Sequence, residues 1–573
     1  GFNDTTVTEY RRDLNLSKGK ADVTFKHDGV TYTREYFASN PDNVMVARLT
    51  ASKAGKLNFN VSMPTNTNYS KTGETTTVKG DTLTVKGALG NNGLLYNSQI
   101  KVVLDNGEGT LSEGADGASL KVSDAKAVTL YIAAATDYKQ KYPSYRTGET
   151  AAEVNTRVAK VVQDAANKGY TAVKKAHIAD HSAIYDRVKI DLGQSGHSSD
   201  GAVATDALLK AYQRGSATTA QKRELETLVY KYGRYLTIGS SRENSQLPSN
   251  LQGIWSVTAD DNAHGNTPWG SDFHMNVNLQ MNYWPTYSAN MGELAEPLIE
   301  YVEGLVKPGR VTAKVYAGAE TTNPETTPIG EGEGYMAHTE NTAYGWTAPG
   351  QSFSWGWSPA AVPWILQNVY EAYEYSGDPA LLDRVYALLK EESHFYVNYM
   401  LHKAGSSSGD RLTTGVAYSP EQGPLGTDGN TYESSLVWQM LNDAIEAAKA
   451  KGDPDGLVGD TTDCSANNWA KGDNGNFTDA NANRSWSCAK SLLKPIEVGD
   501  SGQIKEWYFE GALGKKKDGS AISGYQADNQ HRHMSHLLGL FPGDLITIDN
   551  SEYMEAAKTC LLYTSPSPRD MRR

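Results

Sequence analysis

The segment from Ser271 to Met281 concentrates neutral polar side chains in an apolar and aromatic setting. His274, Asn276 and Asn278 stand at positions i, i+2 and i+4 of this segment. In an extended segment these three side chains would share one face. Buried amides cost free energy unless their donors and acceptors are satisfied, so the row predicts an internal polar network or a polar ligand. A sugar suits amides, imidazole and tryptophan together, because its hydroxyls lie in the ring plane beside a C–H face.

Glu421 is the best candidate for an acid that protonates a leaving glycosidic oxygen. An inverting glycosidase also needs a water, activated by a base, between two groups about 6.5 to 9.5 Å apart. Glu421 follows Ser419-Pro420 and precedes Gln422-Gly-Pro, a turned setting that can keep a carboxyl away from bulk water in its protonated form. For such a glutamate a surface carboxylate or a helix cap is otherwise the better interpretation, and the Ser-Pro-Glu context reverses it only together with the family resemblance given below.

Five blocks of the sequence resemble the signatures of glycoside hydrolase family 95. They are Leu247–Trp255, Trp269–Asp272, His274–Trp284, Ser419–Glu421 and His531–His536. Five blocks in one order over about half of the chain are far more specific than any single motif. The best-known members of this family are inverting 1,2-α-L-fucosidases.

The resemblance implies a role for each residue of the reaction. Glu421 would be the general acid, and Asn276 and Asn278 would hold the attacking water while a distant Asp supplies the basicity that an amide lacks. No matching Asp motif follows the histidine block, so we predict that the base is missing from this chain. Asp272 and Asp528 are the alternatives, although each is more typical of a structural residue.

The remaining candidates are contacts to the sugar. His274 is predicted to bind a hydroxyl, although a satisfied core histidine is the alternative. Glu340 would accept hydrogen bonds from two hydroxyls, and Trp355 would pack on the C–H face or on the methyl group of a deoxy sugar, unless it belongs to the core. The resemblance implies that Arg532 and His533 also bind the sugar.

Metal and cofactor sites are not expected. His531, His533 and His536 have a zinc-like spacing, but no cysteine or flanking carboxylate set completes a site. The glycines of Gly330–Gly334 alternate with glutamates, without a preceding strand or a following helix, and would repel a phosphate.

Composition and charge exclude several partner classes. A net charge of -13 and a pI near 5.5 argue against nucleic acid and anionic membranes. No run of about 18 apolar residues predicts a transmembrane segment. Cys464 and Cys488 lie in one Asn/Gly-rich insert and either form a disulfide, as in an exported protein, or remain free thiols. We expect an extracellular or cell-surface bacterial protein, although no signal segment is visible.

The pattern of the chain predicts four segments. Residues 1–145 alternate polar and apolar residues between turn clusters, which is typical of an antiparallel β-sandwich. Residues 146–203 have a helical period and are predicted to form a linker, and all eleven tryptophans follow residue 250. Residues 204–559 contain helices joined by long loops, which the resemblance makes an (α/α)6 barrel. Residues 560–573 read like a non-native, adapter-derived tail, so we expect a chain truncated at both ends.

The sequence therefore predicts an inverting glycosidase without a cofactor, which releases terminal α-L-fucose, α1,2-linked, from fucosylated oligosaccharides or glycans. An α-L-galactosidase of the same family remains open, because the two sugars differ by one hydroxyl and an apolar pocket rejects it weakly. A glycoside phosphorylase of similar architecture and a non-catalytic carbohydrate-binding fragment also remain open. We expect the 573-residue chain itself to be inactive or insoluble, because an incomplete barrel exposes apolar faces.

Overall fold

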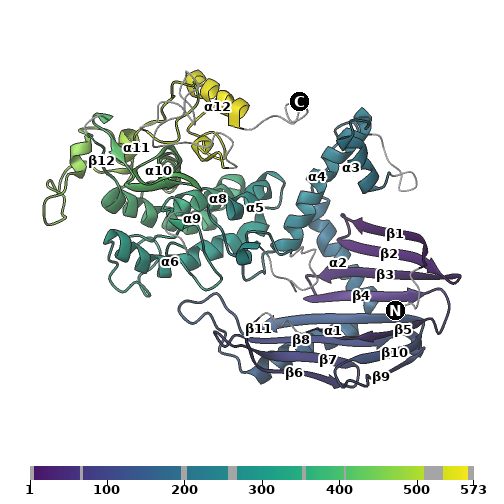
Figure 1. Cartoon of the computed structure of the whole chain (residues 1–573). Helices are drawn as coiled ribbons and strands as arrows, with labels where there is room; N and C mark the ends of the chain where they lie inside the picture. The colour runs from purple at the N-terminus through teal and green to yellow at the C-terminus, as the bar shows by residue number, and fades with distance from the viewer. Residues whose placement is uncertain are drawn as a thin grey trace. The chain divides into compact units, whose positions relative to one another are not determined.

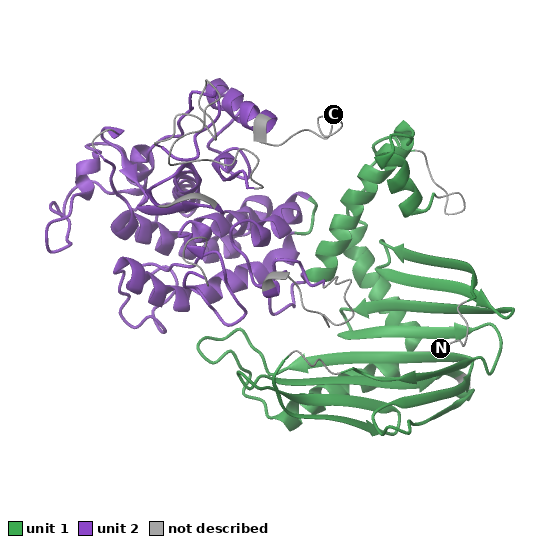
Figure 2. Ribbon diagram, in the orientation of Figure 1, with its two compact units in different colours: residues 1–240, 260–264, 289–291 green, residues 241–259, 265–288, 292–573 purple. Residues whose placement is uncertain are grey.

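The computed structural model describes residues 6–64, 69–194, 203–255, 268–350, 356–405, 408–508 and 533–564. The chain divides into two compact units, one of residues 1–240, 260–264 and 289–291 and the other of residues 241–259, 265–288 and 292–573 (Figure 2). Each unit has its own hydrophobic core.

The first unit is built on an eight-stranded antiparallel sheet with the order β1-β2-β3-β4-β11-β8-β7-β6 (Figure 1). Its strands are β1 (Thr8–Asn15), β2 (Lys20–His27), β3 (Val30–Ser39), β4 (Val44–Ala51), β6 (Lys71–Lys79), β7 (Thr82–Leu89), β8 (Leu95–Leu104) and β11 (Ala127–Thr136). A second sheet has the order β5-β10-β9. It consists of β5 (Leu57–Val61), β9 (Thr110–Glu113) and β10 (Leu120–Ala125), and the short helix η1 (Asp105–Gly107) follows β8. The antiparallel β domain predicted at the N-terminus is confirmed.

Both faces of the large sheet are buried. Val128 of β11 packs with Val122 of β10 in a core shared by the two sheets. Tyr131, which is on the opposite face of the same strand, packs with Val158 and Val162 of α1 (Ala151–Lys168). β11 is therefore apolar along most of its length, because each side of the sheet has a different apolar partner.

Residues 146–203 were predicted to be a helical linker, and their two helices pack on the sheet. A capping box starts α1, because the amide of Glu153 donates to Thr150 Oγ1 and the Glu153 carboxylate accepts from the amide of Thr150. Gly169 separates α1 from α2 (Tyr170–Tyr185), which packs on β3.

The first unit extends past the predicted boundary at residue 203. It includes α3 (Thr205–Gln213) and α4 (Thr219–Ser240). Arg234 of α4 donates to the carbonyl oxygen of Ile184 at 3.0 Å, so α4 is bound to α2. Packing therefore assigns α3 and α4 to the unit that contains the sheet. The helical period of their sequence did not indicate this assignment.

The second unit is mainly helical, as predicted. Its helices are η2 (Pro268–Ser271), α5 (Asn278–Ser288), η3 (Gly292–Ala295), α6 (Glu296–Ala317), α8 (Ala361–Ser376), α9 (Pro379–Phe395), η4 (Tyr396–Met400), α10 (Thr431–Ala450), η6 (Ala466–Trp469), α11 (Trp486–Leu492), η7 (Ser535–Leu537) and α12 (Ser551–Thr564). Its short strands are β12 (His402–Lys403), β13 (Leu412–Thr413), β14 (Val416–Ser419) and β15 (Gln422–Asp428). Among the described helices, none has the length and hydropathy needed to span a bilayer.

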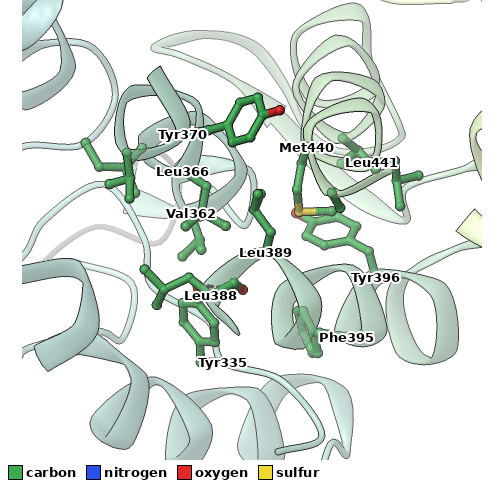
Figure 3. Packing of buried hydrophobic residues seen from close by; sticks show 14 of the residues in the cluster. Tyr335, Val362, Leu366, Tyr370, Leu388, Leu389, Phe395, Tyr396, Met440 and Leu441 are labelled. Carbon is green, nitrogen blue, oxygen red and sulfur yellow. Dashed lines mark hydrogen bonds between the residues drawn. The ribbon is translucent and has the colours of Figure 1, made fainter. Parts of the chain in front are cut away.

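Neighbouring helices of this unit pack around a shared apolar core. Helix α8 packs against α5, α9 and α10. Figure 3 shows this core, to which α8 contributes Val362 and Leu366, α9 contributes Leu388 and Leu389, and α10 contributes Met440 and Leu441. Helix α8 is apolar on most of its surface, which is typical of a helix buried between several neighbours.

Local sequence sets the junction between α8 and α9. Gly377 ends α8 in a left-handed conformation with φ of 65°, which glycine adopts without steric cost. Asp378 then accepts a hydrogen bond from the amide of Ala380, and Pro379 stands at the first position of α9. These three residues reverse the chain within one turn.

A buried ion pair ties α6 to α9. Arg310 donates from Nε and Nη2 to the two oxygens of Glu391 at 2.7 and 2.8 Å, and both side chains are fully buried. The amide of Gly330 also donates to Glu391. A Cβ on Gly332 would lie 2.4 Å from Glu391 Oε1, so the glycine-rich run is required for close packing here.

The insert between α10 and α11 contains a covalent link. Cys464 and Cys488 form a disulfide with Cα atoms 5.5 Å apart, which decides between the two states that the sequence left open.

We predict that Glu391→Gln lowers the free energy of unfolding by about 3–5 kcal/mol, because it leaves the Arg310 cation buried without a carboxylate. Urea denaturation measures this change. The control is Glu320→Gln, which breaks the exposed Lys314–Glu320 pair and should cost less than about 1 kcal/mol. Equal losses in the two variants would contradict the importance of the buried pair.

Candidate active site

The segment that carries His274 and Asn276 is held by backbone hydrogen bonds. The amides of Phe273 and Met275 donate to the carbonyl oxygens of Asn341 and Thr339 at 2.9 and 2.8 Å. Beyond Met275 the segment turns, and α5 begins at Asn278. The segment is therefore not extended beyond Met275, so the condition under which all three polar side chains would share one face is not met.

Four of the predicted site residues meet at one carboxylate oxygen. Glu421 Oε1 accepts a hydrogen bond from Asn276 Nδ2 at 2.8 Å. The Nε2 atoms of His274 and His533 lie 3.9 and 3.7 Å from the same oxygen. Asn276 is 1 % exposed and His274 is 7 % exposed, whereas the side chains of Glu421 and His533 are 21 % and 11 % exposed, so the cluster is mostly buried and reaches solvent at the carboxyl group. Residues from three distant parts of the chain thus form one polar centre.

Asn276 and Glu421 are in direct contact. An inverting site needs room for a sugar and a water between its two reacting groups, and here the amide itself occupies the space beside the acid. The other amide atom, Asn276 Oδ1, is buried and has no hydrogen-bond partner among the described residues. Such an atom is an acceptor ready for a water or a sugar hydroxyl.

The turn that carries Glu421 is fixed by two contacts that the sequence did not predict. Ser419, at the end of β14, donates its hydroxyl to the carboxylate of Glu506, and both residues are fully buried. Ser535 donates its hydroxyl to the carbonyl oxygen of Pro420 at 3.0 Å. Ser535 lies within the His-Arg-His-Met-Ser-His block, which was a usable signal. Glu506 lies in no motif, and only the fold reveals its role.

His274 carries a positive charge at neutral pH. Its Nδ1 donates to Asp272 Oδ2 at 2.9 Å. Burial by itself lowers the pKa of His274, but the hydrogen bond to Asp272 and the neighbouring Glu421 carboxylate raise this pKa to about 9. Asp272 therefore orients and charges the imidazole, which agrees with its structural interpretation.

The histidines of the C-terminal block contact different carboxylates. His533 faces Glu421, whereas His536 Nδ1 lies 3.8 Å from Glu506 Oε2. Burial lowers the pKa of His536 to about 4, so this ring is neutral at pH 7. His531, the third member of the zinc-like spacing, lies outside the described residues.

Of the other predicted residues, the structure describes Asn278 and Glu340. Asn278 is the half-buried first residue of α5. Glu340 follows Thr339, and a Cβ on Gly350 would lie 1.8 Å from Glu340 Oε2, so its carboxylate packs closely on that glycine. Trp355, Arg532 and Asp528 lie outside the described residues.

Trp357, the neighbour of the predicted Trp355, belongs to the core. It is 6 % exposed, and its Nε1 donates to the carbonyl oxygen of Val416 at 2.9 Å.

Comparison with known families gives two matches along the chain. Residues 169–566 match the profile of the glycosyl hydrolase family 95 catalytic domain, and residues 1–141 match that of the glycosyl hydrolase family 65 N-terminal domain. The catalytic profile begins inside the first compact unit, because sequence similarity includes α2 to α4 whereas packing groups them with the sheet.

Curated relatives and a solved structure agree with these matches. "Alpha-L-fucosidase 2" of Arabidopsis thaliana is 28 % identical over 96 % of this chain, and "Probable alpha-fucosidase A" of Aspergillus niger is 29 % identical over 97 %. The chain spans 61 % and 63 % of the length of these relatives. A solved structure assigned as a kojibiose phosphorylase from the human microbiome is 12 % identical, with a TM-score of 0.53, and covers 87 % of this chain and 58 % of its own. At that identity the likeness concerns the fold alone.

We predict that Asp272→Asn lowers the pKa of His274 by about one unit or more, because the largest stabiliser of its charge is removed. NMR titration of the His274 ring measures this pKa. The matched control is Asp428→Asn, which removes the carboxylate beside His402 and should leave His274 unchanged.

The same charge makes stability depend on pH. The folded-state pKa of about 9 exceeds the ordinary value of 6.5, so protonated His274 stabilises the folded state fully below about pH 6.5, and this contribution is lost as the pH rises through 9. The decline should be smaller in Asp272→Asn. A wild-type His274 that titrates near pH 6.5 would contradict the assignment.

Proposed function

The chain belongs to glycosyl hydrolase family 95, and on this premise we propose that the protein releases terminal α-L-fucose from fucosylated oligosaccharides with inversion. The observation that carries the proposal is the contact between Asn276 and Glu421 inside a buried cluster with two histidines. The names of the curated relatives support fucose as the sugar. We also propose α1,2-linked fucose as the substrate and an exported location, which the disulfide supports.

Glu421 is proposed to be the general acid. When it gives its proton to the leaving oxygen, it becomes a carboxylate beside the charged His274 ring and the amide of Asn276. Both groups stabilise that negative charge as it develops, because they are already oriented toward the carboxyl group in a mostly buried site. His533 lies close enough to contribute in the same way.

The amides are proposed to hold the attacking water. A bound sugar would replace the Asn276–Glu421 hydrogen bond and open the separation that inversion requires. Asn276 Oδ1 would then accept a hydrogen bond from the water, together with Asn278. Neither amide can take the proton, and Asp272 is engaged with His274, so the basicity must come from another carboxylate.

The helices of the second unit are proposed to form part of an (α/α)6 barrel. Consecutive helices α8, α9 and α10 pack against one another, as successive members of such a barrel do. The likeness in fold to a solved structure with a TM-score of 0.53 supports this architecture. It does not favour phosphorolysis, because that likeness is limited to the fold.

We predict that the full-length protein releases the β-anomer of L-fucose first from 2′-fucosyllactose, because inversion of an α-linkage produces it. Proton NMR during the first minutes of reaction measures the anomer. The rate should not depend on inorganic phosphate, which separates hydrolysis from phosphorolysis. Release of α-fucose first would exclude inversion.

We predict that Glu421→Gln in the full-length protein lowers kcat by at least about a hundredfold, with little change in the Kd of the substrate, because it removes proton donation and keeps most contacts. Steady-state kinetics and calorimetry measure the two quantities. Glu320→Gln, on the exposed surface of the same unit, serves as the control. Unchanged turnover in Glu421→Gln would refute the assignment of the acid.

A further inference from the structure

Residues 340–350 form a surface loop whose two ends are joined. The amide of Thr339, just before the loop, bonds to the carbonyl oxygen of Gly356, and a Cβ on Gly356 would lie 2.6 Å from the amide nitrogen of Gly350. The loop therefore leaves the body of the second unit and returns to the same place, as a compact Ω-loop does.

The base of this loop lies between the two halves of the candidate site. On one side, Thr339 and Asn341 accept the backbone hydrogen bonds of the segment that carries His274 and Asn276. On the other side, Trp357 donates to Val416, the first residue of the strand that ends at the Glu421 turn. The base of the loop therefore contacts both chain segments that meet at Glu421.

Helix α6 holds the loop in one conformation at two points. Tyr301 Oη donates to the carbonyl oxygen of Thr342 at 3.2 Å. The hydroxyls of Thr312 and Thr347 share a hydrogen bond of 2.7 Å, and Thr347 is buried. A turn bond from the amide of Gly345 to Thr342 shapes the tip between these points.

The tip presents aromatic side chains to solvent. Tyr344 is 37 % exposed and Trp346 is 52 % exposed. Among the tryptophans whose side chains the structure describes, Trp346 alone is more than a third exposed. An ordered loop that leaves half of an indole exposed beside a partly exposed tyrosine is typical of a binding surface, since large aromatic side chains are usually buried.

We propose that Trp346, assisted by Tyr344, binds the pyranose on the leaving side of the scissile bond. This inference rests on the proposed function, in which the fucose occupies the buried cluster around Glu421. The rest of the oligosaccharide then passes the loop base, and the C–H face of its next sugar packs on the indole. The loop would therefore make the enzyme prefer oligosaccharides over simple fucosides.

The test compares two ligands that differ in the leaving group. In the Glu421→Gln background, which prevents turnover, calorimetry measures the Kd of 2′-fucosyllactose and of methyl α-L-fucoside. Adding Trp346→Ala should raise the Kd of 2′-fucosyllactose about tenfold and change that of methyl fucoside less than about twofold. Trp346→Phe should recover most of the affinity, because it restores an aromatic face.

A matched control and two adverse outcomes complete the experiment. Tyr375→Ala removes another aromatic ring of the second unit, 62 % exposed on α8, and should change neither Kd. If both ligands bind and Trp346→Ala affects them equally or not at all, the leaving-side site is refuted and the proposed function stands. If neither ligand binds before Trp346 is changed, both proposals fail.

Discussion

The second unit depends on the buried ion pair between Arg310 and Glu391. Each charge would be costly to bury alone, and together they satisfy one another with two hydrogen bonds. The guanidinium also donates to three carbonyl oxygens within residues 324–328. This loop leads into residues 339–341, which hold the backbone of Phe273 and Met275. Through this loop, the contact between α6 and α9 determines the position of the segment that carries His274 and Asn276.

The candidate site combines one acid with groups that favour its ionised form. The charged His274 ring and the Asn276 amide both face Glu421. The turn that carries Glu421 is held from two sides, by Ser419 and by Ser535. A functional side chain needs firm support of this kind to keep its geometry.

The motifs predicted which polar residues share a site, and tertiary packing determined the contacts between them. The motifs placed His274, Asn276, Glu421 and His533 in one candidate site, and in the structure their side chains surround one carboxylate oxygen, although Asn276 and Glu421 are 145 positions apart. The spacing could not show whether this segment is extended, because positions i and i+4 also share one face of a helix. Glu506 was missed because only tertiary packing brings it to the acid turn.

The helical segments also showed that local sequence patterns do not predict tertiary packing. The period of α3 and α4 predicted helices correctly, but no local pattern states which body a helix will join. The first unit therefore continues past its predicted end. The antiparallel sheet could be predicted, because strand alternation is a local signal, whereas the spacing of the two cysteines left the disulfide open.

The Asn276–Glu421 contact has a kinetic consequence. It joins positions 145 apart in the chain, so most of the intervening polypeptide must be organised before the contact forms. Loops of this length close late during folding, because the entropy that is lost on closure is compensated only when many other contacts exist. The ability to bind a ligand would then be one of the last properties that the chain acquires after synthesis. Partly folded chains would not bind the ligand.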